Sequence, residues 1–237
     1  MTEGGGDVIC LLDPQEDELL YSVVARTFDS LADVRQSAFF RELFGRQQTT
    51  FSLSLPVGLD RFLGNIQPWS AILKLDIIQD LTLYPYYAVF APETQRRNVI
   101  DRMLTGRIVS EIGGYQQYLR AVKGKQYVSI CLQCVEMDRE KYGVAHYRRQ
   151  HQLPCAWICQ IHGIPLLNTQ VSMRNSSKSE INVKITSLEN AVEGASLPGW
   201  ISHLSPSQLS AMNQISQAGG WILKNPIHPK DNAVFRG

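Results

Sequence analysis

Two short pairs of metal-binding residue types constrain this chain more than any other feature of its sequence. Cys131 and Cys134 form a Cys-x-x-Cys pair, and Cys159 and His162 form a Cys-x-x-His pair. Each pair can present two ligand atoms from one tight turn, and a structural zinc ion takes four such ligands in a tetrahedron. We therefore expect these four side chains to bind one Zn²⁺, which would replace part of the hydrophobic core that a small segment lacks.

The spacing of the two pairs leaves alternatives open. The 24 residues between Cys134 and Cys159 exceed the separation in compact zinc fingers. With a helix expected over residues 141–150, this stretch would form an inserted lobe. Ordinary buried thiols beside an unrelated histidine would give the same pattern. The spare ligand candidates are His146, His151 and Cys155, although Cys155 in place of Cys159 would break the two-pair spacing.

A zinc ion becomes catalytic only with an open coordination position and a nearby general base. The nearest acids are Glu136, Asp138 and Glu140, and nothing in the sequence fixes one of them at a metal-bound water. The sequence also lacks GxxxxGK[ST], GxGxxG after a strand, GxSxG and HExxH, the signatures of common enzyme classes. We therefore predict a structural zinc, no catalytic residue and no enzymatic activity, with a metal-dependent hydrolase as a remote rival.

Charge is concentrated locally, since the whole chain has a formal net charge of only +1. Between residues 119 and 163 seven bases face three acids, and Tyr142 and Tyr147 interleave with the bases. Basic side chains beside aromatic ones suit contacts with nucleic-acid phosphates. We expect DNA contacts from this set, with a solvated helix face as the alternative: Arg120, Lys123, Lys125, Arg139, Lys141, Arg148 and Arg149.

The first twenty residues have the opposite charge, with six acids and no base. Such a segment avoids DNA and suits a basic protein surface, so we expect partner contacts from Asp13, Glu16, Asp17 and Glu18. It lacks the basic start of a secretory signal, and no apolar run is long enough to span a membrane. The clustering of four of the five cysteines favours a reducing compartment. We expect a cytoplasmic protein that associates with the nucleoid when bound, without a membrane partner.

Hydrophobic periodicity and caps predict a mainly α fold with a small β part. Helices are expected from a capping box at residues 13–16 to residue 31, and over residues 34–44, 59–66, 70–81 and 92–104. The stretch LTLYPYYAVFAP is expected to be an extended, buried connector. KQYVSI and INVKITSL resemble strands, NTQVSMRNSSKSE resembles a loop, and a helix capped at residues 205–208 should close near Gly219.

Three stretches around the metal pairs, YVSICLQC, YGVAHYRRQHQLP and CQIHGIPLL, resemble in order and spacing the core signature of the TniQ/TnsD family of transposon target-site selectors. Upstream, DELLYSVVAR resembles the opening helix of that family, and LTLYPYYAVFAP resembles its Tyr/Phe/Pro-rich connector. The resemblance covers about residues 10–170. Family members often have Pro after the first cysteine of each pair, where this chain has Leu132 and Gln160, neither of them a ligand.

The resemblance implies an N-terminal helical domain of helix-turn-helix type followed by a zinc-finger domain of zinc-ribbon type. We expect a helical domain over residues 1–120, a zinc-binding core over residues 121–170, and a C-terminal segment with a strand and a helix over residues 171–237. Related proteins of the TnsD kind usually continue well beyond this length, so the resemblance implies either a short member or a truncated chain.

The resemblance also implies a non-enzymatic adaptor that marks an insertion site in DNA transposition and recruits an AAA+ ATPase regulator of the TnsC kind. Some members read an attachment site in double-stranded DNA, and others dock on a CRISPR RNA-guided complex of the Cascade type. A second copy of the chain is a further candidate partner. The rival function is a stand-alone zinc-finger DNA-binding regulator, which would bind a defined duplex without an ATPase.

Overall fold

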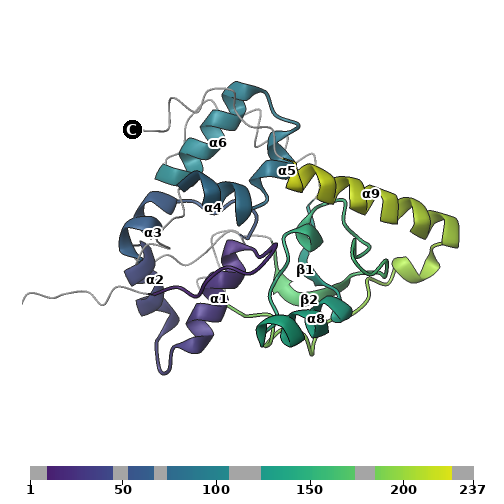
Figure 1. Ribbon diagram of the computed structural model, residues 1–237, viewed down its shortest axis with the longest axis horizontal. Helices are drawn as coiled ribbons and strands as arrows, with labels where there is room; N and C mark the ends of the chain where they lie inside the picture. The colour runs from purple at the N-terminus through teal and green to yellow at the C-terminus, as the bar shows by residue number, and fades with distance from the viewer. Residues whose placement is uncertain (1–9, 45–52, 67–73, 107–123, 174–184, 226–237) are drawn as a thin grey trace, which may run out of the picture.

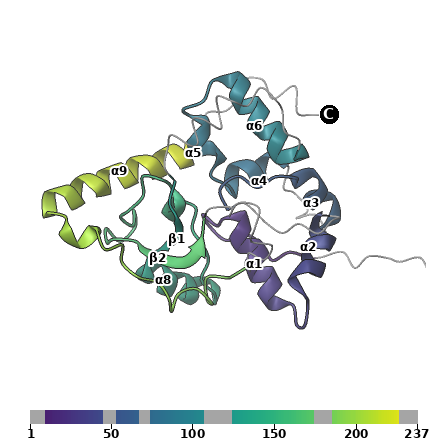
Figure 2. The same ribbon diagram turned by 180° about the vertical axis from the view of Figure 1, so that it is seen from behind.

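The computed structural model describes residues 10–44, 53–66, 74–106, 124–173 and 185–225 (Figure 1). The described part of the chain is mainly helical with one two-stranded antiparallel sheet, which confirms the predicted fold class. Figures 1 and 2 show helices α1 to α6 on one side of the molecule, the sheet and helix α8 on the other, and the long helix α9 reaching from α5 across the sheet side. No helix among the described residues is long and apolar enough to cross a lipid bilayer.

The helical part consists of short helices that share one aromatic core. The predicted helices at residues 34–44, 59–66 and 92–104 are confirmed to within two residues, and the helix predicted over residues 70–81 is described from Lys74. Phe44 stacks on Phe40 and Phe62 at centroid distances of 6.0 and 5.5 Å. The helices are α1 (Leu20–Ser30), α2 (Gln36–Phe44), α3 (Leu59–Asn65), α4 (Lys74–Asp80), α5 (Tyr84–Ala88) and α6 (Glu93–Thr105).

Two predictions in the helical part were wrong. The connector LTLYPYYAVFAP is buried as expected, but its centre forms helix α5. Pro85 lies in the first turn of that helix, where a missing N–H costs nothing. Helix α1 begins at Leu20 rather than near Asp13, because Asp17 takes a left-handed φ of 61° and Glu18 turns inward. The buried Glu18 carboxylate accepts hydrogen bonds from the Arg26 guanidinium at 2.7 and 2.8 Å.

The expected strand at KQYVSI is confirmed as β1 (Tyr127–Ile130), which runs directly into Cys131. Helix α8 (Leu132–Tyr142) follows at once, so the helix predicted over residues 141–150 was wrong. Gly143 ends α8 with a φ of 76°, a conformation that glycine adopts without steric cost. The residues beyond it run in an irregular path, apart from the 3-10 turn η2 (Gln150–Gln152).

The sheet partner of β1 is β2 (Leu167–Ser172), a stretch predicted as a polar loop. Its polar residues fit because only one face of the strand is covered: Thr169 and Val171 are buried, whereas Gln170 is exposed. In the predicted strand INVKITSL, residues 185–188 are irregular and residues 181–184 lie outside the described ranges. The register places Ile130, which precedes Cys131, opposite Leu167, which follows the Cys159 and His162 pair. The sheet therefore links the segment before the first Cys/His pair to the segment after the second.

Helix α9 (Pro206–Lys224) begins with the predicted capping box, in which Ser205 accepts from the Gln208 N–H and Gln208 accepts from the Ser205 N–H. It continues through Gly219 and Gly220 to Lys224, so the predicted end near Gly219 was wrong. The two glycines let the helix approach the side chains of Cys155 and Gln160 closely. A Cβ at Gly219 would lie 2.3 Å from the Cys155 sulfur.

A single hydrophobic cluster extends through the described residues from Leu11 to Leu223 and includes side chains of the helices, the sheet and α9. The domain boundaries predicted near residues 120 and 170 stay a prediction, and the first of them lies outside the described ranges.

The close contacts of α9 with Cys155 and Gln160 lead to two stability predictions. Gly219→Ala should lower the free energy of unfolding by about 1–3 kcal/mol, because the added methyl overpacks a site closed by the Cys155 sulfur and by Leu153. Gly220→Ala should cost less, since its methyl meets only the flexible Gln160 side-chain amide, whose nitrogen has no hydrogen-bond partner. Chemical denaturation of both variants measures the difference, and equal losses would contradict this account of the contact.

Candidate metal centre

The first metal pair lies at the start of helix α8. Cys131 is the residue before the first helical turn, and Cys134 is in that turn, so both sulfurs face the same side. The Val135 N–H donates to the Cys131 carbonyl at 3.0 Å, which fixes the spacing of the two. Both side chains are buried. A helix N-terminus also favours negatively charged sulfur, because its unpaired N–H groups and dipole point toward the site.

The second pair lies on a tight hairpin between Ile158 and Pro165, which form an isolated antiparallel bridge. The Gly163 N–H donates to the Cys159 carbonyl at 2.8 Å, and Gly163 has a φ of 67°, which explains why glycine follows the histidine. The His162 backbone N–H points at the Cys159 sulfur at 3.4 Å. Cys159 is fully buried and His162 is half-buried, so the centre is nearly closed to water.

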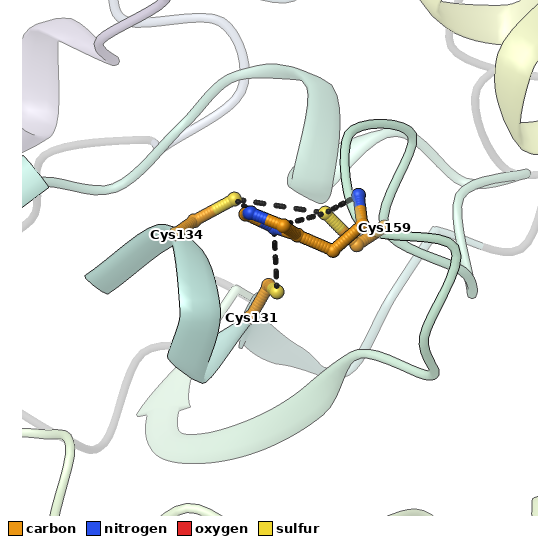
Figure 3. Close-up of side chains that lie close together, drawn as sticks. Cys131, Cys134 and Cys159 are labelled. Atoms are coloured by element: carbon orange, nitrogen blue, oxygen red, sulfur yellow. Dashed lines mark hydrogen bonds between the residues drawn. The ribbon is translucent and has the colours of Figure 1, made fainter. Parts of the chain in front are cut away.

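The four predicted ligands are brought together in the structure. Figure 3 shows the three cysteines converging from α8 and from the hairpin, and the ligand atoms of Cys131, Cys134, Cys159 and His162 all lie within 4.8 Å of one another. The Cys134 and Cys159 sulfurs are 3.6 Å apart. The His162 Nδ1 lies 3.3, 3.4 and 3.6 Å from the sulfurs of Cys134, Cys131 and Cys159.

These distances fit a tetrahedral zinc site. Ordinary Zn–S and Zn–N bond lengths place two sulfurs about 3.8 Å apart, and a sulfur and a nitrogen about 3.6 Å apart. A buried group of three cysteines and one histidine with this spacing can hold a metal ion, and its thiolates favour a soft or borderline ion such as zinc. When bound, the ion would offset most of the thiolate charge and cross-link helix α8 to the hairpin.

The three thiols differ in the direction of their pKa shifts. Hydrogen bonding from Cys134 and Cys159 holds the pKa of Cys131 well below its usual range. Hydrogen bonding to Cys131 and burial raise the pKa of both Cys134 and Cys159, because a second thiolate would lie against the first. A divalent cation removes this repulsion, so a metal must displace the protons of Cys134 and Cys159 to bind.

The three spare ligand candidates do not belong to the four-residue group. The Cys155 sulfur packs under Gly219 of α9, and the His146 Nε2 donates to the Glu16 carbonyl at 3.0 Å. His151 is closer, with its Nε2 3.6 Å from the Cys159 sulfur and 3.8 Å from the Cys134 sulfur. It is nevertheless outside the compact four-residue group. Burial lowers the pKa of His151 to about 3, so its ring is neutral.

The predicted DNA contacts are largely used inside the protein. Lys125 donates to the His151 carbonyl at 2.6 Å and to Ser129 Oγ at 2.9 Å, and burial lowers its pKa to about 7. Arg148 is paired with Asp138, and Arg149 donates to backbone carbonyls of residues 79 and 82. These three side chains are buried, which argues against the DNA contacts predicted for Lys125, Arg148 and Arg149.

Two of the remaining predicted DNA contacts lie on the surface but pair with acids. Arg139 contacts Glu189 and Glu136 at 2.6 and 2.8 Å, and Lys141 contacts Glu16 at 3.2 Å. Arg120 and Lys123 lie outside the described residues.

The acidic N-terminal set also divides into internal and surface residues. Glu18 is buried against Arg26, and the Asp17 carboxylate faces the Arg149 guanidinium at 3.5 Å. These two carboxylates are buried beside arginine side chains, which argues against the partner contacts predicted for Asp17 and Glu18. Asp13 and Glu16 are exposed, and Glu16 pairs with Lys141 at the surface, so contacts from these two residues with a partner stay a prediction.

Sequence reasoning missed the role of residues 145–152, which we call the connecting segment. Its backbone lies along residues 17–19: the Leu19 N–H donates to the Tyr147 carbonyl at 3.0 Å, and the Arg149 N–H donates to the Asp17 carbonyl at 2.7 Å. The fully buried Tyr147 also donates its N–H to Ser22 Oγ at 2.9 Å. The connecting segment therefore links the part of the chain with the candidate metal ligands to the entry of helix α1.

Two buried polar residues that anchor the connecting segment were missed as well. The Gln152 side chain accepts from the Ser129 N–H and donates to the Ser129 carbonyl, both at 2.8 Å. Asp138, which binds Arg148, falls four residues after Cys134 on α8. That helical spacing from a ligand was a signal that could have placed Asp138 on the buried face, whereas nothing local marks Gln152.

Metal content and proton release test the centre. We expect one tightly bound zinc per chain, which Cys159→Ser abolishes together with much of the thermal stability. At neutral pH, binding should release about two protons, and apparent affinity should rise about 100-fold per pH unit while Cys134 and Cys159 are protonated. Calorimetry in buffers of different ionisation enthalpy counts the protons. A metal-free wild-type chain with normal stability would exclude the centre.

Comparison with known proteins identifies a family whose matched range includes the four candidate ligands. The model of the TniQ family matches residues 10–166, a range that runs from the residues before helix α1 through all four candidate ligands. The chain is also 26% identical over 153 residues to the Tn7 transposition protein TnsD of Escherichia coli. That alignment includes 63% of this chain and 30% of TnsD, so the chain spans less than a third of the length of this relative.

The family match covers well over half of the 237 residues, and it includes both the helical part and the metal centre. The chain therefore belongs to the TniQ family.

Proposed function

We propose that this chain is a non-enzymatic adaptor for target selection in DNA transposition, which marks an insertion site and recruits an AAA+ ATPase regulator of the TnsC kind. The observation that carries the proposal is the TniQ match over residues 10–166, since it spans helix α1, the connecting segment and the candidate metal ligands as one unit. The similarity to TnsD, a transposition protein, supports the same role.

In this proposal Zn²⁺ is a structural ion. Cys131, Cys134, Cys159 and His162 would fill its coordination sphere, which leaves no open position for a reacting water. The ion would stabilise α8 and the hairpin, and the connecting segment would transmit that rigidity to the N-terminal helices. A rigid platform suits an adaptor, because binding surfaces that are already ordered lose less conformational entropy when the partners bind. The N-terminal helices would form the helix-turn-helix-type domain of this platform.

The charge distribution favours protein partners for the metal-bearing part. Five of the seven predicted DNA-binding residues are described, and each of the five is either buried or paired with an acid. Such a surface offers few free cations to exchange for the counterions of a duplex. Docking on a CRISPR RNA-guided complex, or on another protein that finds the target, therefore suits this part better than direct reading of DNA. Any direct DNA contact would come from other regions.

The decisive experiment separates an adaptor from a direct reader of DNA. The purified chain is tested for retention of a nucleotide-loaded AAA+ transposition regulator, with and without DNA, and for binding to an attachment-site duplex by fluorescence anisotropy. We expect ATPase retention, with weak duplex binding by the chain alone. Tight, steeply salt-dependent binding to a defined duplex without any ATPase contact would instead indicate the stand-alone DNA-binding regulator.

The exposed acids of the N-terminal segment give a specific variant. Asp13→Lys combined with Glu16→Lys should lower ATPase retention by about tenfold, because like charges would then face a basic partner surface. The control is Glu193→Lys, which makes the same kind of change at an exposed acid distant in sequence. Unchanged retention by the double variant, with its fold intact by circular dichroism, would remove this segment from the interface. Equal losses in the variant and the control would indicate a nonspecific charge effect.

A further inference from the structure

His151 lies against the metal centre without belonging to its ligand set. Its Nε2 is 3.6 Å from the Cys159 sulfur and 3.8 Å from the Cys134 sulfur, so it approaches the edge between these two cysteines. The group in which every ligand atom lies within 4.8 Å of every other contains His162 but not His151. The His151 ring therefore faces two ligands from outside the tetrahedron.

We propose that His151 is a positioning residue of the metal centre, and that its Nε2–H donates a shared hydrogen bond to the thiolates of Cys134 and Cys159. The inference rests on the proposed zinc site and adds a residue to it. The proton must then be on Nε2, which leaves Nδ1 as the unprotonated nitrogen of the neutral ring.

The charge of the centre creates the need for such a donor. Three thiolates, one neutral imidazole and Zn²⁺ would carry a net charge of −1, and the three cysteine residues are at most 2% exposed. Burying that charge without compensating hydrogen bonds is costly. Cys159 receives one backbone N–H, from His162 at 3.4 Å. The His151 Nε2 lies between Cys134 and Cys159, where a second N–H would stabilise both sulfurs as thiolates.

The surroundings fix the backbone around His151 independently of any metal. Its backbone carbonyl accepts from the buried Lys125 ammonium at 2.6 Å. The next residue, Gln152, is fixed to strand β1 through both the N–H and the carbonyl of Ser129. Such support fits a donor whose direction matters, since outer hydrogen bonds orient ligands and tune metal affinity. His151 also belongs to the connecting segment, so it links the centre to the backbone that pairs with residues 17–19.

Two substitutions separate the hydrogen bond from simple packing. His151→Phe keeps a planar ring and removes the N–H, whereas His151→Gln keeps an N–H donor at about the same distance from the backbone. We expect His151→Phe to weaken zinc binding by about 10- to 100-fold in competition with a chromogenic chelator. His151→Gln should stay within about threefold of the wild-type chain. Urea denaturation of the metal-free proteins measures the packing effect of each variant separately.

Cobalt spectra provide the second readout on the full chain. We expect the ligand-field bands of bound Co²⁺ to keep the pattern of three sulfurs and one nitrogen in both His151 variants, and to lose it in His162→Ala. A His151→Phe protein with wild-type zinc affinity would overturn the inference, as would a loss of affinity matched by an equal loss of metal-free stability. Loss of the nitrogen-ligand pattern in His151→Phe would also overturn it, because His151 would then be a ligand. Failure of the wild-type chain to bind metal would instead refute the proposed centre itself.

Discussion

The mutual repulsion of three buried sulfurs is the constraint on which the rest of the structure depends. Cys131, Cys134 and Cys159 come from two segments separated along the chain, and their sulfurs meet in a closed space where more than one negative charge is unfavourable without a cation. Strand β1 delivers one pair to the centre and strand β2 leaves from the other, so the small sheet and the ligands enforce the same geometry. Neither the sheet nor the hairpin has enough core of its own to do this alone.

The sheet, helix α8 and the hairpin with the candidate metal ligands share one hydrophobic core with the N-terminal helices. The stretch between the two pairs, expected as an inserted lobe, instead passes along the N-terminal segment and places Tyr147 and Arg149 in the interior. The basic character of this stretch therefore has a structural cause. Arg148 pairs with the buried Asp138 carboxylate and Arg149 donates to the carbonyls of Gln79 and Thr82 at and after the end of helix α4, which accounts for two of the bases that suggested nucleic acid.

Sequence patterns predicted the features that depend on local chemistry and missed those set by distant contacts. The clustering of the four candidate ligands, strand β1, the capping box at Ser205 and most helices follow from spacing, periodicity and side-chain type. The late start of α1 and the irregular path after Gly143 do not, because backbone pairing between residues 17–19 and 147–149 overrides local helix preference in both. Likewise α9 continues past Gly219, because the Cys155 sulfur lies so close to this position that a Cβ would clash with it.

The pairing of residues 17–19 with the connecting segment also bears on how the protein is made. About 130 residues separate the two partners, so at ordinary elongation rates the ribosome needs roughly ten seconds between them. During that interval the Glu18 carboxylate and the entry to helix α1 lack the strand-like neighbour that later covers them. Completion of the N-terminal fold must therefore wait for synthesis of the cysteine-bearing half, which makes maturation of the nascent chain dependent on its later segments.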